Sequence, residues 1–448
     1  MTSGRMLRGT AVTFAAEIAG LLISVATSIL LARALGPEGR GVYAVAMLLP
    51  AMVVSFGHLG LGTASTYLIA RKKYSPTSVF ATNLGFIVIV GALGLGAGAI
   101  AILLLADSAL AGAPHGLLWL GLALVLPDLA ISYTRYILLG LSRIPRYNAV
   151  YVAQRVLSLC FLIIALVALG AGVKGAVVAA VSARWLAAAI SALLTARAVM
   201  ATEGRFRFDI KCAKEALAYG VKFHLGGIVA FLNLRLDLLL VNSFLGVTQV
   251  GLYTVAVGLV EKLWLLPQAA SAVLFPRIAS EDDEARKGRI TSTIVRNVLL
   301  ISVVSGGIIV LIGRWLIPVL YGGHFRGSVG ALYALMTGAV ASSGSRVLGN
   351  DLAARGHPML NTYFGIAALA LNLGLNLWWI PFAGIAGAAW ASSCSYLLLF
   401  VLRFAAYVHV SKEKWNDVLF VRWADLKLYK QGIRGVFAAI RSRALPRA

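Results

Sequence analysis

The chain repeats part of itself about 210 residues further along. A twelve-residue segment that begins at Leu35 and another that begins at Leu245 are identical at six positions, namely Leu35, Gly36, Gly41, Tyr43, Val45 and Ala46 and their counterparts. Two later segments also return: Pro145 and Asn148 as Pro358 and Asn361, and residues 172–176 as 384–388. The three offsets are 210, 213 and 212 residues. An offset this constant indicates that one half of the chain was duplicated.

The composition places both copies in a membrane. The chain is 60% hydrophobic and 13% charged, and its mean hydropathy is +0.87. Soluble proteins carry about 25% charged residues, so a soluble domain of this length could not cover so much apolar surface. The long apolar runs predict an all-α integral membrane protein. Two like halves in a membrane are typical of a transporter with its substrate path between them.

The apolar runs predict twelve transmembrane helices in two parallel six-helix repeats. We expect them at 12–34, 41–69, 79–105, 115–140, 147–169, 173–199, 216–244, 249–279, 290–320, 328–353, 359–380 and 384–410. The organisation that follows is an N-terminal lobe at 1–200, a cytoplasmic linker at 201–215, a C-terminal lobe at 216–410 and a tail at 411–448. Apolar and basic residues in the tail recur at spacings of three to four, which predicts a basic amphipathic helix on the membrane surface.

Lysine and arginine predict the orientation. With the N-terminus in the cytoplasm, inside segments hold twenty-six of these residues and outside loops hold four, namely Arg33, Arg40, Lys174 and Arg326. This asymmetry favours both termini in the cytoplasm. The net charge of +23 is therefore read as contact with anionic membrane lipids and not with nucleic acid. No expected outer loop is long enough for a catalytic domain, no phosphate-binding loop is present, and histidine and cysteine form no metal pattern, so we expect neither an enzyme nor a metal site.

Three segments carry a family resemblance: Leu30–Tyr43 at the first turn, Arg235–Leu240 in the seventh expected helix, and Gly384–Ala389 at the start of the twelfth. In these residues the chain resembles the polysaccharide flippases, which export lipid-linked O-antigen and exopolysaccharide units. They belong to the superfamily that also holds multidrug and toxic-compound extrusion (MATE) exporters and lipid II flippases. The resemblance implies a MATE-like two-lobed bundle in a bacterial inner membrane. It also implies alternating access and a polyprenyl-pyrophosphate-linked oligosaccharide as cargo for cell-surface polysaccharide synthesis. Docking to a polysaccharide polymerase or other assembly proteins stays open as a second role.

The first of these segments has a structural interpretation. Gly36 and Gly41 bracket a tight outer turn, and Pro37 cannot continue a helix. Tyr43 is expected at the membrane interface, where aromatic rings anchor. We therefore expect this segment to shape the hairpin without touching cargo.

An anionic pyrophosphate head needs cations in a wet cavity, because burying the anion alone is too costly. The deep candidates are Arg184, Arg235, Lys262 and Arg155. The alternative for Arg235 and Lys262 is a structural ion pair with Glu261 and Asp237 at similar depth. Arg184 has no obvious partner, which favours contact with the cargo. Arg135, Lys222, Arg296 and Arg403 lie nearer the cytoplasmic ends, where we expect their side chains to reach the headgroups.

Acids inside the bundle are candidates for coupling transport to a cation. Asp237 and Glu261 are the first choices and Glu17 the third, while Asp128 follows Pro127 and is expected to cap a broken helix. A proton, a sodium ion or no coupled ion at all stay open, and no cofactor is expected. Two other functions also stay open: a cation-coupled multidrug antiporter on the same fold, whose cavity should be rich in acids, and a lipid II flippase, which typically has two further helices.

Overall fold

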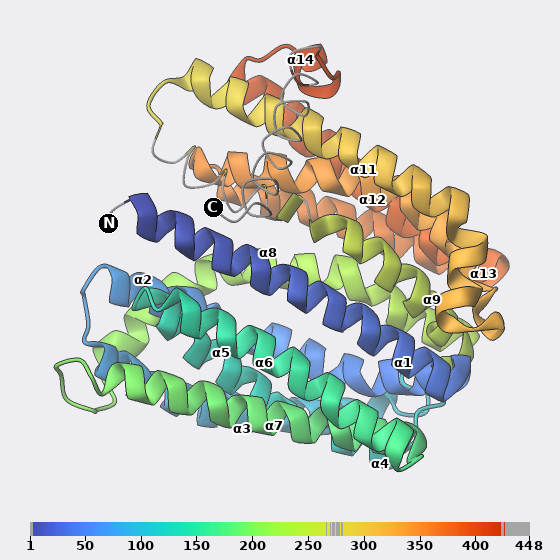
Figure 1. Ribbon diagram of the computed structural model, residues 1–448, viewed down its shortest axis with the longest axis horizontal. Helices are drawn as coiled ribbons and strands as arrows, with labels where there is room; N and C mark the ends of the chain where they lie inside the picture. The colour runs from blue at the N-terminus through green and yellow to red at the C-terminus, as the bar shows by residue number, and fades with distance from the viewer. Residues whose placement is uncertain are drawn as a thin grey trace, which may run out of the picture. The chain divides into compact units, whose positions relative to one another are not determined.

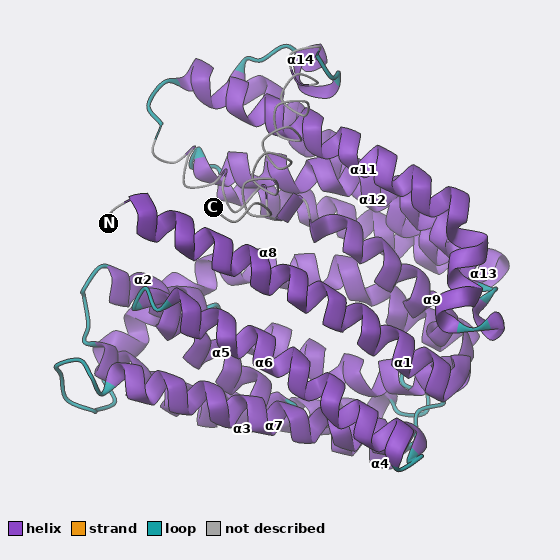
Figure 2. Cartoon of the chain, in the orientation of Figure 1, coloured by secondary structure: helices purple, strands orange, loops and turns teal. Residues whose placement is uncertain are grey.

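The computed structural model describes residues 3–422 and 425, apart from 266, 269, 271–273, 275–277 and 279–280. Side chains are described from residue 12 onward, except that of Phe223. Throughout these residues every regular element is a helix (Figure 2). The prediction of an all-α membrane protein is therefore confirmed as a fold class. Eight of the described helices are long and apolar enough to cross a membrane.

The helices are labelled in Figure 1. Those of the first half are α1 (Ser3–Gly57), α2 (Leu61–Ala70), α3 (Pro76–Leu105), α4 (His115–Leu122), α5 (Val125–Gly140), α6 (Ile144–Ile163), a π-helical turn (Ile164–Ala168) and α7 (Gly172–Val199). Those that follow are α8 (Ile210–Leu245), α9 (Val247–Val260), a 3₁₀ turn (Glu261–Trp264), α11 (Glu284–Tyr321), a 3₁₀ turn (Gly323–Phe325), α12 (Ser328–Ala354), α13 (Pro358–Ser411) and α14 (Trp415–Leu419).

Several expected helices are joined or divided. The first two expected helices share α1, which is kinked at Gly36, and the last two share α13, which is kinked at Gly384. The expected helix at 115–140 is broken into α4 and α5. Part of the expected helix at 249–279, and the tail beyond Arg422 except Asp425, lie outside the described residues. The count of twelve crossings and the lobe boundaries stay predictions.

The backbone repeats together with the sequence. Gly36 has φ +67° and ψ −177°, and its counterpart Gly246 has φ +80° and ψ +173°. Only glycine adopts this region without strain, so both turns need glycine at that position. The second matched pair behaves alike, because Gly172 and Gly384 have φ values of +58° and +59°. The paired glycines therefore share a positive φ at both places.

The second glycine of each motif has a different role from the expected one. A Cβ atom on Gly41 would lie 1.7 Å from the carbonyl oxygen of Val247, and one on Gly251 would lie 1.8 Å from that of Pro37. Val247 and Gly251 are the counterparts of Pro37 and Gly41. The two copies of the motif therefore pack against each other reciprocally, backbone to backbone. Gly41 makes this approach possible and does not merely shape its own hairpin.

Arg40 lies beside this contact and is not a solvated loop residue. Its side chain is only 7% exposed. It donates to the carbonyl and hydroxyl oxygens of Ser28 at 2.6 and 3.0 Å and to Thr254 Oγ1 at 3.1 Å. Its guanidinium carbon lies 5.8 Å from the ring centre of Tyr321. Arg40 thus ties the first motif to the helix that carries the second.

The chain forms two compact units, one of residues 1–259, 313–335 and 369–392 and one of 260–312, 336–368 and 393–448. In the first unit α6 packs against α1 and α7, and α5 packs against α2, α3 and α7 (Figure 1). These contacts bring the middle parts of α1, α5, α6 and α7 around one space.

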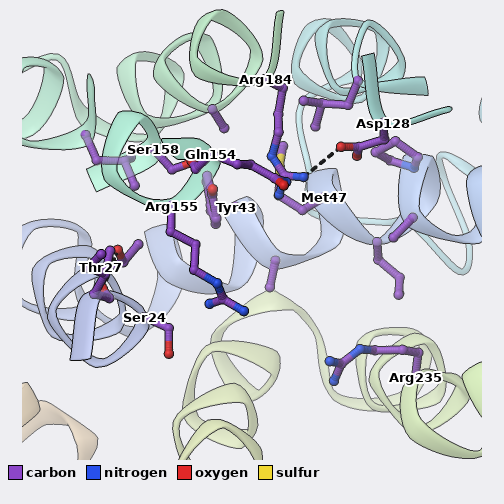
Figure 3. Close-up of a pocket in the computed structure, with 18 of the residues that line it drawn as sticks. Ser24, Thr27, Tyr43, Met47, Asp128, Gln154, Arg155, Ser158, Arg184 and Arg235 are labelled. Atoms are coloured by element: carbon purple, nitrogen blue, oxygen red, sulfur yellow. Dashed lines mark hydrogen bonds and ion pairs between the residues drawn. The ribbon is translucent and has the colours of Figure 1, made fainter. Parts of the chain in front are cut away.

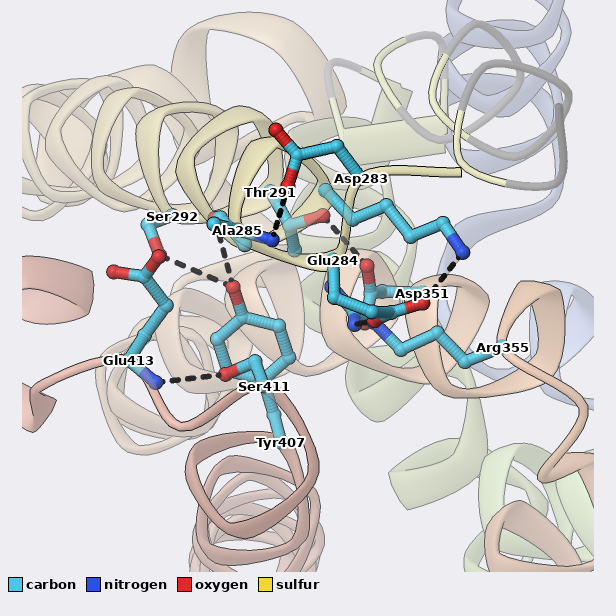
Figure 4. Close-up of polar contacts among 12 residues, drawn as sticks. Asp283, Glu284, Ala285, Thr291, Ser292, Asp351, Arg355, Tyr407, Ser411 and Glu413 are labelled. Carbon is cyan, nitrogen blue, oxygen red and sulfur yellow. Dashed lines mark hydrogen bonds and ion pairs between the residues drawn. The ribbon is translucent and has the colours of Figure 1, made fainter. Parts of the chain in front are cut away.

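The second unit is held by polar contacts as well as by an apolar core. Asp351 accepts hydrogen bonds from Thr291 at 2.6 Å and Arg355 at 2.7 Å (Figure 4). Arg296 was expected to reach the headgroups, and this is wrong: it is 4% exposed and binds both carboxylate oxygens of Asp425 at 2.8 and 3.0 Å. This pair attaches the segment after α14 to α11.

The reciprocal glycine contact predicts a large effect of a single methyl group. We expect Gly41→Ala and Gly251→Ala each to lower the free energy of unfolding by about 3 kcal/mol or more, because the new Cβ would overlap a backbone carbonyl that cannot move alone. Gly96→Ala is the matched control, since nothing lies within 4 Å of a Cβ there. Thermal unfolding of the purified protein in detergent measures the effect, and three equally stable variants would contradict the contact.

Candidate functional site

A cavity of about 620 Å³ lies within the first compact unit, lined by α1, α5, α6, α7 and α8. Three of the four predicted deep cations line it: Arg155 from α6, Arg184 from α7 and Arg235 from α8 (Figure 3). Residues that are 80 positions apart in the sequence are thus brought to one space by helix packing.

Positive charge dominates the walls of this cavity. Among the described residues, its lining includes a fourth arginine, Arg135, and one carboxylate, Asp128. A cleft lined by one sign of charge with apolar walls between the charges concentrates counter-ions of the opposite sign. The lining therefore favours an anionic occupant over a cationic one.

Arg184 is paired, so the expectation that it has no partner is wrong. Its Nη1 lies 2.6 Å from Asp128 Oδ1, and both side chains are partly open, at 34% and 24% exposure (Figure 3). Asp128 lies in the first turn of α5, directly after the break that separates α4 from α5. The break places the carboxylate opposite the middle of α7, so an anion that binds Arg184 must compete with Asp128.

Arg155 and Arg235 extend toward the same space from α6 and α8 (Figure 3). Arg155 Nη1 donates to the carbonyl oxygen of Gly20 at 3.3 Å, and its guanidinium lies 4.6 Å from the ring centre of Tyr151. Arg235 Nη1 lies 3.4 Å from the carbonyl oxygen of Leu234. These contacts help to orient the two guanidinium groups.

Arg135 was expected to reach the headgroups, but the structure places it on the cavity wall. Its Nη2 donates to the Tyr147 hydroxyl at 2.6 Å, and its guanidinium lies 4.3 and 5.4 Å from the ring centres of Tyr147 and Tyr151. Its Nε–H is buried and meets no acceptor within the described residues. The sequence held one clue to this position: Tyr147 and Tyr151 are one helical turn apart on the next helix, and aromatic faces bind cations.

Two residues of α1, Tyr43 and Glu17, lie at or next to the cavity. Tyr43 lines the cavity, so the first motif does touch this space and is not confined to the membrane interface. Glu17 is half-buried and accepts a hydrogen bond from the Tyr151 hydroxyl at 3.0 Å. Glu17 therefore contacts a tyrosine that lines the cavity.

Lys262 and Glu261 are not among the residues that line this cavity. They lie on the 3₁₀ turn Glu261–Trp264, at the start of the second compact unit. In the part of the chain that the structure describes, no three His, Cys, Asp or Glu side chains are grouped so that they could hold a metal ion.

Asp237 is the centre of a separate buried cluster. It is 2% exposed, and its Oδ2 accepts from the hydroxyls of Tyr253 at 2.6 Å and Ser392 at 3.2 Å. Asn372 Nδ2 donates to the same serine at 3.3 Å, and Asn376 Nδ2 donates to Asn372 Oδ1 at 3.0 Å. Asn376 Oδ1 is buried and meets no donor within the described residues. The cluster thus gathers oxygen atoms from α8, α9 and α13 around one carboxylate.

The Arg184–Asp128 pair predicts an asymmetric mutational effect. We expect Arg184→Gln to lower the free energy of unfolding by about 1–3 kcal/mol, because it leaves a largely covered carboxylate without its cation. The double variant Asp128→Asn/Arg184→Gln should recover most of this loss. Arg155→Gln is the control, since it removes a carbonyl contact and an aromatic contact but breaks no pair with a carboxylate of the cavity lining. Urea or thermal unfolding in detergent would give the comparison. A single variant as stable as the parent would show that the pair contributes no stability.

Solved structures share this fold at low sequence identity. An inward-facing multidrug resistance MATE family transporter of the MOP superfamily matches with a TM-score of 0.72 and 16% identity, over 90% of this chain and 98% of that one. The lipid II flippase MurJ in an inward closed conformation matches with a TM-score of 0.72 and 14% identity, over 98% of this chain and all of the other. At these identities the likeness shows the fold alone.

Two curated proteins are similar in sequence. One, named as an O-antigen transporter of Shigella flexneri, is 23% identical over 84% of this chain and 91% of its own length. The other, named as the low-salt glycan biosynthesis flippase Agl15 of Haloferax volcanii, is 26% identical over 41% of this chain and 39% of its own length.

A family model described as polysaccharide biosynthesis protein matches residues 30–330, about two thirds of the chain. The match includes the first motif, its repeat and every arginine of the cavity. The resemblance seen in the sequence is therefore confirmed: this multi-pass membrane protein belongs to the polysaccharide biosynthesis protein family.

Proposed function

We propose that this protein is a flippase that moves a polyprenyl-pyrophosphate-linked oligosaccharide from the cytoplasmic to the outer leaflet by alternating access. It is a transporter and not an enzyme, and it serves cell-surface polysaccharide synthesis in a bacterial inner membrane. The observation that carries the proposal is the cavity with four arginines and one carboxylate. Both curated relatives, one named as an O-antigen transporter and one as a glycan flippase, support it.

The cavity suits a pyrophosphate head joined to sugars. Guanidinium groups bind phosphate oxygens through paired N–H donors, and an anion leaves water at a tolerable cost only where such donors replace its hydration. The same walls carry neutral hydrogen-bonding groups that suit sugar hydroxyls, namely Ser24, Thr27, Gln154 and Ser158. We assign Arg155, Arg184 and Arg235 to the phosphates, and Lys262 to the same cargo at another stage of its passage.

Arg184 can bind either Asp128 or a phosphate of the cargo. With the cavity empty, the carboxylate neutralises the guanidinium at 2.6 Å. A phosphate that enters displaces the carboxylate, and Asp128 returns when the phosphate leaves. Competition of this kind lowers the affinity for cargo, which a transporter needs because it must also release what it binds.

We also propose a topology for the chain in the membrane. It comprises twelve crossings in two parallel lobes, at 1–200 and 216–410, with the linker, the tail and both termini in the cytoplasm. The kinks at Gly36 and Gly384 support it, since each lies where the sequence predicts a turn between two crossings. Membrane lipids surround the helices, and a polysaccharide polymerase is the partner class we expect.

The charge of the cavity separates this function from its nearest rival. A multidrug antiporter carries cations and needs an acidic cavity, whereas this one holds four cations and one acid. One structure with the same fold is described as having a reversed polarity of its binding pocket, which suggests a different function for that MOP superfamily transporter from Pyrococcus furiosus; it matches here with a TM-score of 0.65 and 15% identity. The polarity of the pocket is therefore more informative than the fold.

Transport can be tested in cells that lack the protein. We expect polyprenyl-pyrophosphate oligosaccharide to accumulate with its sugars facing the cytoplasm, as measured by lipid mass spectrometry and enzymatic access. Wild type should reverse the accumulation. Arg155→Gln/Arg235→Gln should translocate the lipid about tenfold more slowly or worse, because each charge-assisted contact contributes about 1.5–3 kcal/mol. Arg197→Gln, exposed and outside the cavity lining, is the matched control.

Other outcomes point elsewhere. Normal lipid pools together with increased sensitivity to cationic drugs would replace the flippase by the antiporter. Accumulation of lipid II would replace the cargo by that of a lipid II flippase. Full activity of the double variant would remove Arg155 and Arg235 from the site.

We further propose that Asp237 couples transport to a cation, with Glu261 and Glu17 as the alternatives. Asp237 is supported by the oxygen-rich cluster around it, which includes the amide oxygen of Asn376, a buried acceptor that meets no donor among the described residues. Hard cations prefer such oxygen ligands, and a proton could bind the carboxylate itself. Binding of either ion removes the buried negative charge and so links its gradient to the state of α8, α9 and α13.

The coupling proposal predicts a loss of gradient dependence. In proteoliposomes, imposed sodium and pH gradients should each be tested for acceleration of wild-type transport. With Asp237→Asn, we expect the gradient that accelerates wild type to have no effect, because an amide neither ionises nor supplies the same charge. Asp107→Asn is the control, since that carboxylate is 95% exposed. A variant that keeps the full response would transfer the role to Glu261 or Glu17.

A further inference from the structure

The segment between α7 and α8 is an ordered structure with its own cavity. Residues 205–211 read Arg-Phe-Arg-Phe-Asp-Ile-Lys, with basic and apolar side chains alternating up to Asp209. The segment is fixed to α3. Phe208 lies where a side chain on Gly85 would be, with 2.7 Å between its ring and that Cβ position, and Phe206 packs edge-on against Phe80 with ring centres 6.1 Å apart.

Backbone contacts hold the same segment. Thr82 Oγ1 accepts from the backbone N–H of Asp209 at 3.3 Å, and Ser78 Oγ donates to the carbonyl oxygen of Arg207 at 3.5 Å. Asp209 in turn caps α8 by accepting from the N–H groups of Lys211 and Cys212 at 2.8 and 3.1 Å. The side chains of the segment are therefore presented in a set geometry.

A cavity of about 570 Å³ lies between this segment and the turn that joins α2 to α3, and we name it the linker cavity. Four cations line it, namely Lys73, Arg205, Arg207 and Lys211, together with the hydroxyl groups of Tyr74, Ser75 and Ser78. A second cavity of about 570 Å³ adjoins it and shares Lys73, Tyr74 and Ser75. There is thus room for a polar group larger than a single ion.

The linker cavity keeps a net positive charge after its acids are counted. Glu215 binds Lys73, and this hydrogen bond lowers the pKa of Glu215. Both side chains are therefore ionised, and their opposite charges cancel. Asp209 is the one acid among the described residues of the lining, and its carboxylate caps α8. Within the described residues, Arg205, Arg207 and Lys211 form no ion pair. Two positive charges therefore remain in excess.

The rim of the linker cavity is apolar. Phe206 is 61% exposed, Phe208 43% and Ile210 63%, although the first two also pack against α3. Cations beside exposed aromatic side chains at a helix end are typical of the level where lipid headgroups meet acyl chains. A soluble anion would use the cations but would leave these apolar side chains in water.

We propose that the linker cavity binds the phosphate headgroup of an anionic phospholipid from the leaflet that surrounds this end of the bundle. The arginines and hydroxyl groups would hold the phosphodiester, and the acyl chains would cover Phe206, Phe208 and Ile210. The lipid would then join the linker to the α2–α3 turn. This inference rests on the chain spanning a membrane but not on the cargo of the proposed function.

The experiment compares lipid binding by purified full-length variants in detergent. Phosphatidylglycerol and phosphatidylcholine are titrated separately, and retained lipid is measured by native mass spectrometry. We expect wild type to bind phosphatidylglycerol more tightly, and Arg205→Gln/Arg207→Gln to bind it roughly 10- to 30-fold more weakly, because each basic residue near the surface contributes measurably to anionic lipid binding. Arg146→Gln/Arg197→Gln removes the same charge from exposed positions outside both linker-side cavities and should bind normally.

Three results would overturn the proposal. Equal losses in the two double variants would mean a diffuse charge effect, and equal binding of both lipids would mean that the headgroup charge is not recognised. Complete competition by millimolar inorganic phosphate would mean a soluble anion. If the first double variant does not fold, Lys211→Gln and the charge-retaining Arg205→Lys/Arg207→Lys carry the same comparison. Lipid binding in detergent needs no transport, so failure of the proposed function would leave this result intact.

Discussion

The close approach of Gly41 and Gly251 is the constraint on which the arrangement of the first compact unit depends. Each glycine lies against a backbone carbonyl of the other copy of the motif, at separations that leave no space for a side chain. The contact joins α1 to α9 and is reinforced by Arg40, whose hydrogen bonds run to Ser28 and Thr254. Because α1 and α8 also carry cavity residues, the contact between the two motifs helps to set the shape of the cavity.

Several arginines share this partly buried cavity, and their charges must be stabilised there. Carboxylates would neutralise them and remove their use for an anion. Among the described residues that line the cavity, Asp128 is the one carboxylate and it pairs with Arg184, while Arg135 and Arg155 lie against the faces of Tyr147 and Tyr151. Aromatic faces stabilise a cation without cancelling its charge. The described lining therefore keeps a net positive charge after Asp128 is counted.

Individual residues show how far the sequence could predict this site. Depth along an expected helix drew attention to Arg155, Arg184 and Arg235, because a charge far from either end of an apolar run is informative without any knowledge of packing. The partner of Arg184 could not be predicted, since Asp128 is 56 residues away and faces it only because α5 begins at a break. Arg135 was misjudged for a related reason: its distance from the helix end suggested the headgroups, whereas the rotation of α5 turns it toward two tyrosines of α6.

By itself the sequence determined that the chain is helical, embedded in a membrane and internally duplicated, since hydrophobic length and a constant offset are properties of the linear order of residues. It also determined where glycine is needed, as at Gly36 and Gly246. Only the tertiary structure decided that Gly41 and Gly251 meet, that the arginines share one cavity and that residues 205–211 enclose another. These features depend on how each helix is rotated about its axis and which neighbour it packs against. A rotation of half a turn would leave the hydrophobic pattern nearly unchanged, because lipid and protein interior are both apolar, yet it would redirect every charge.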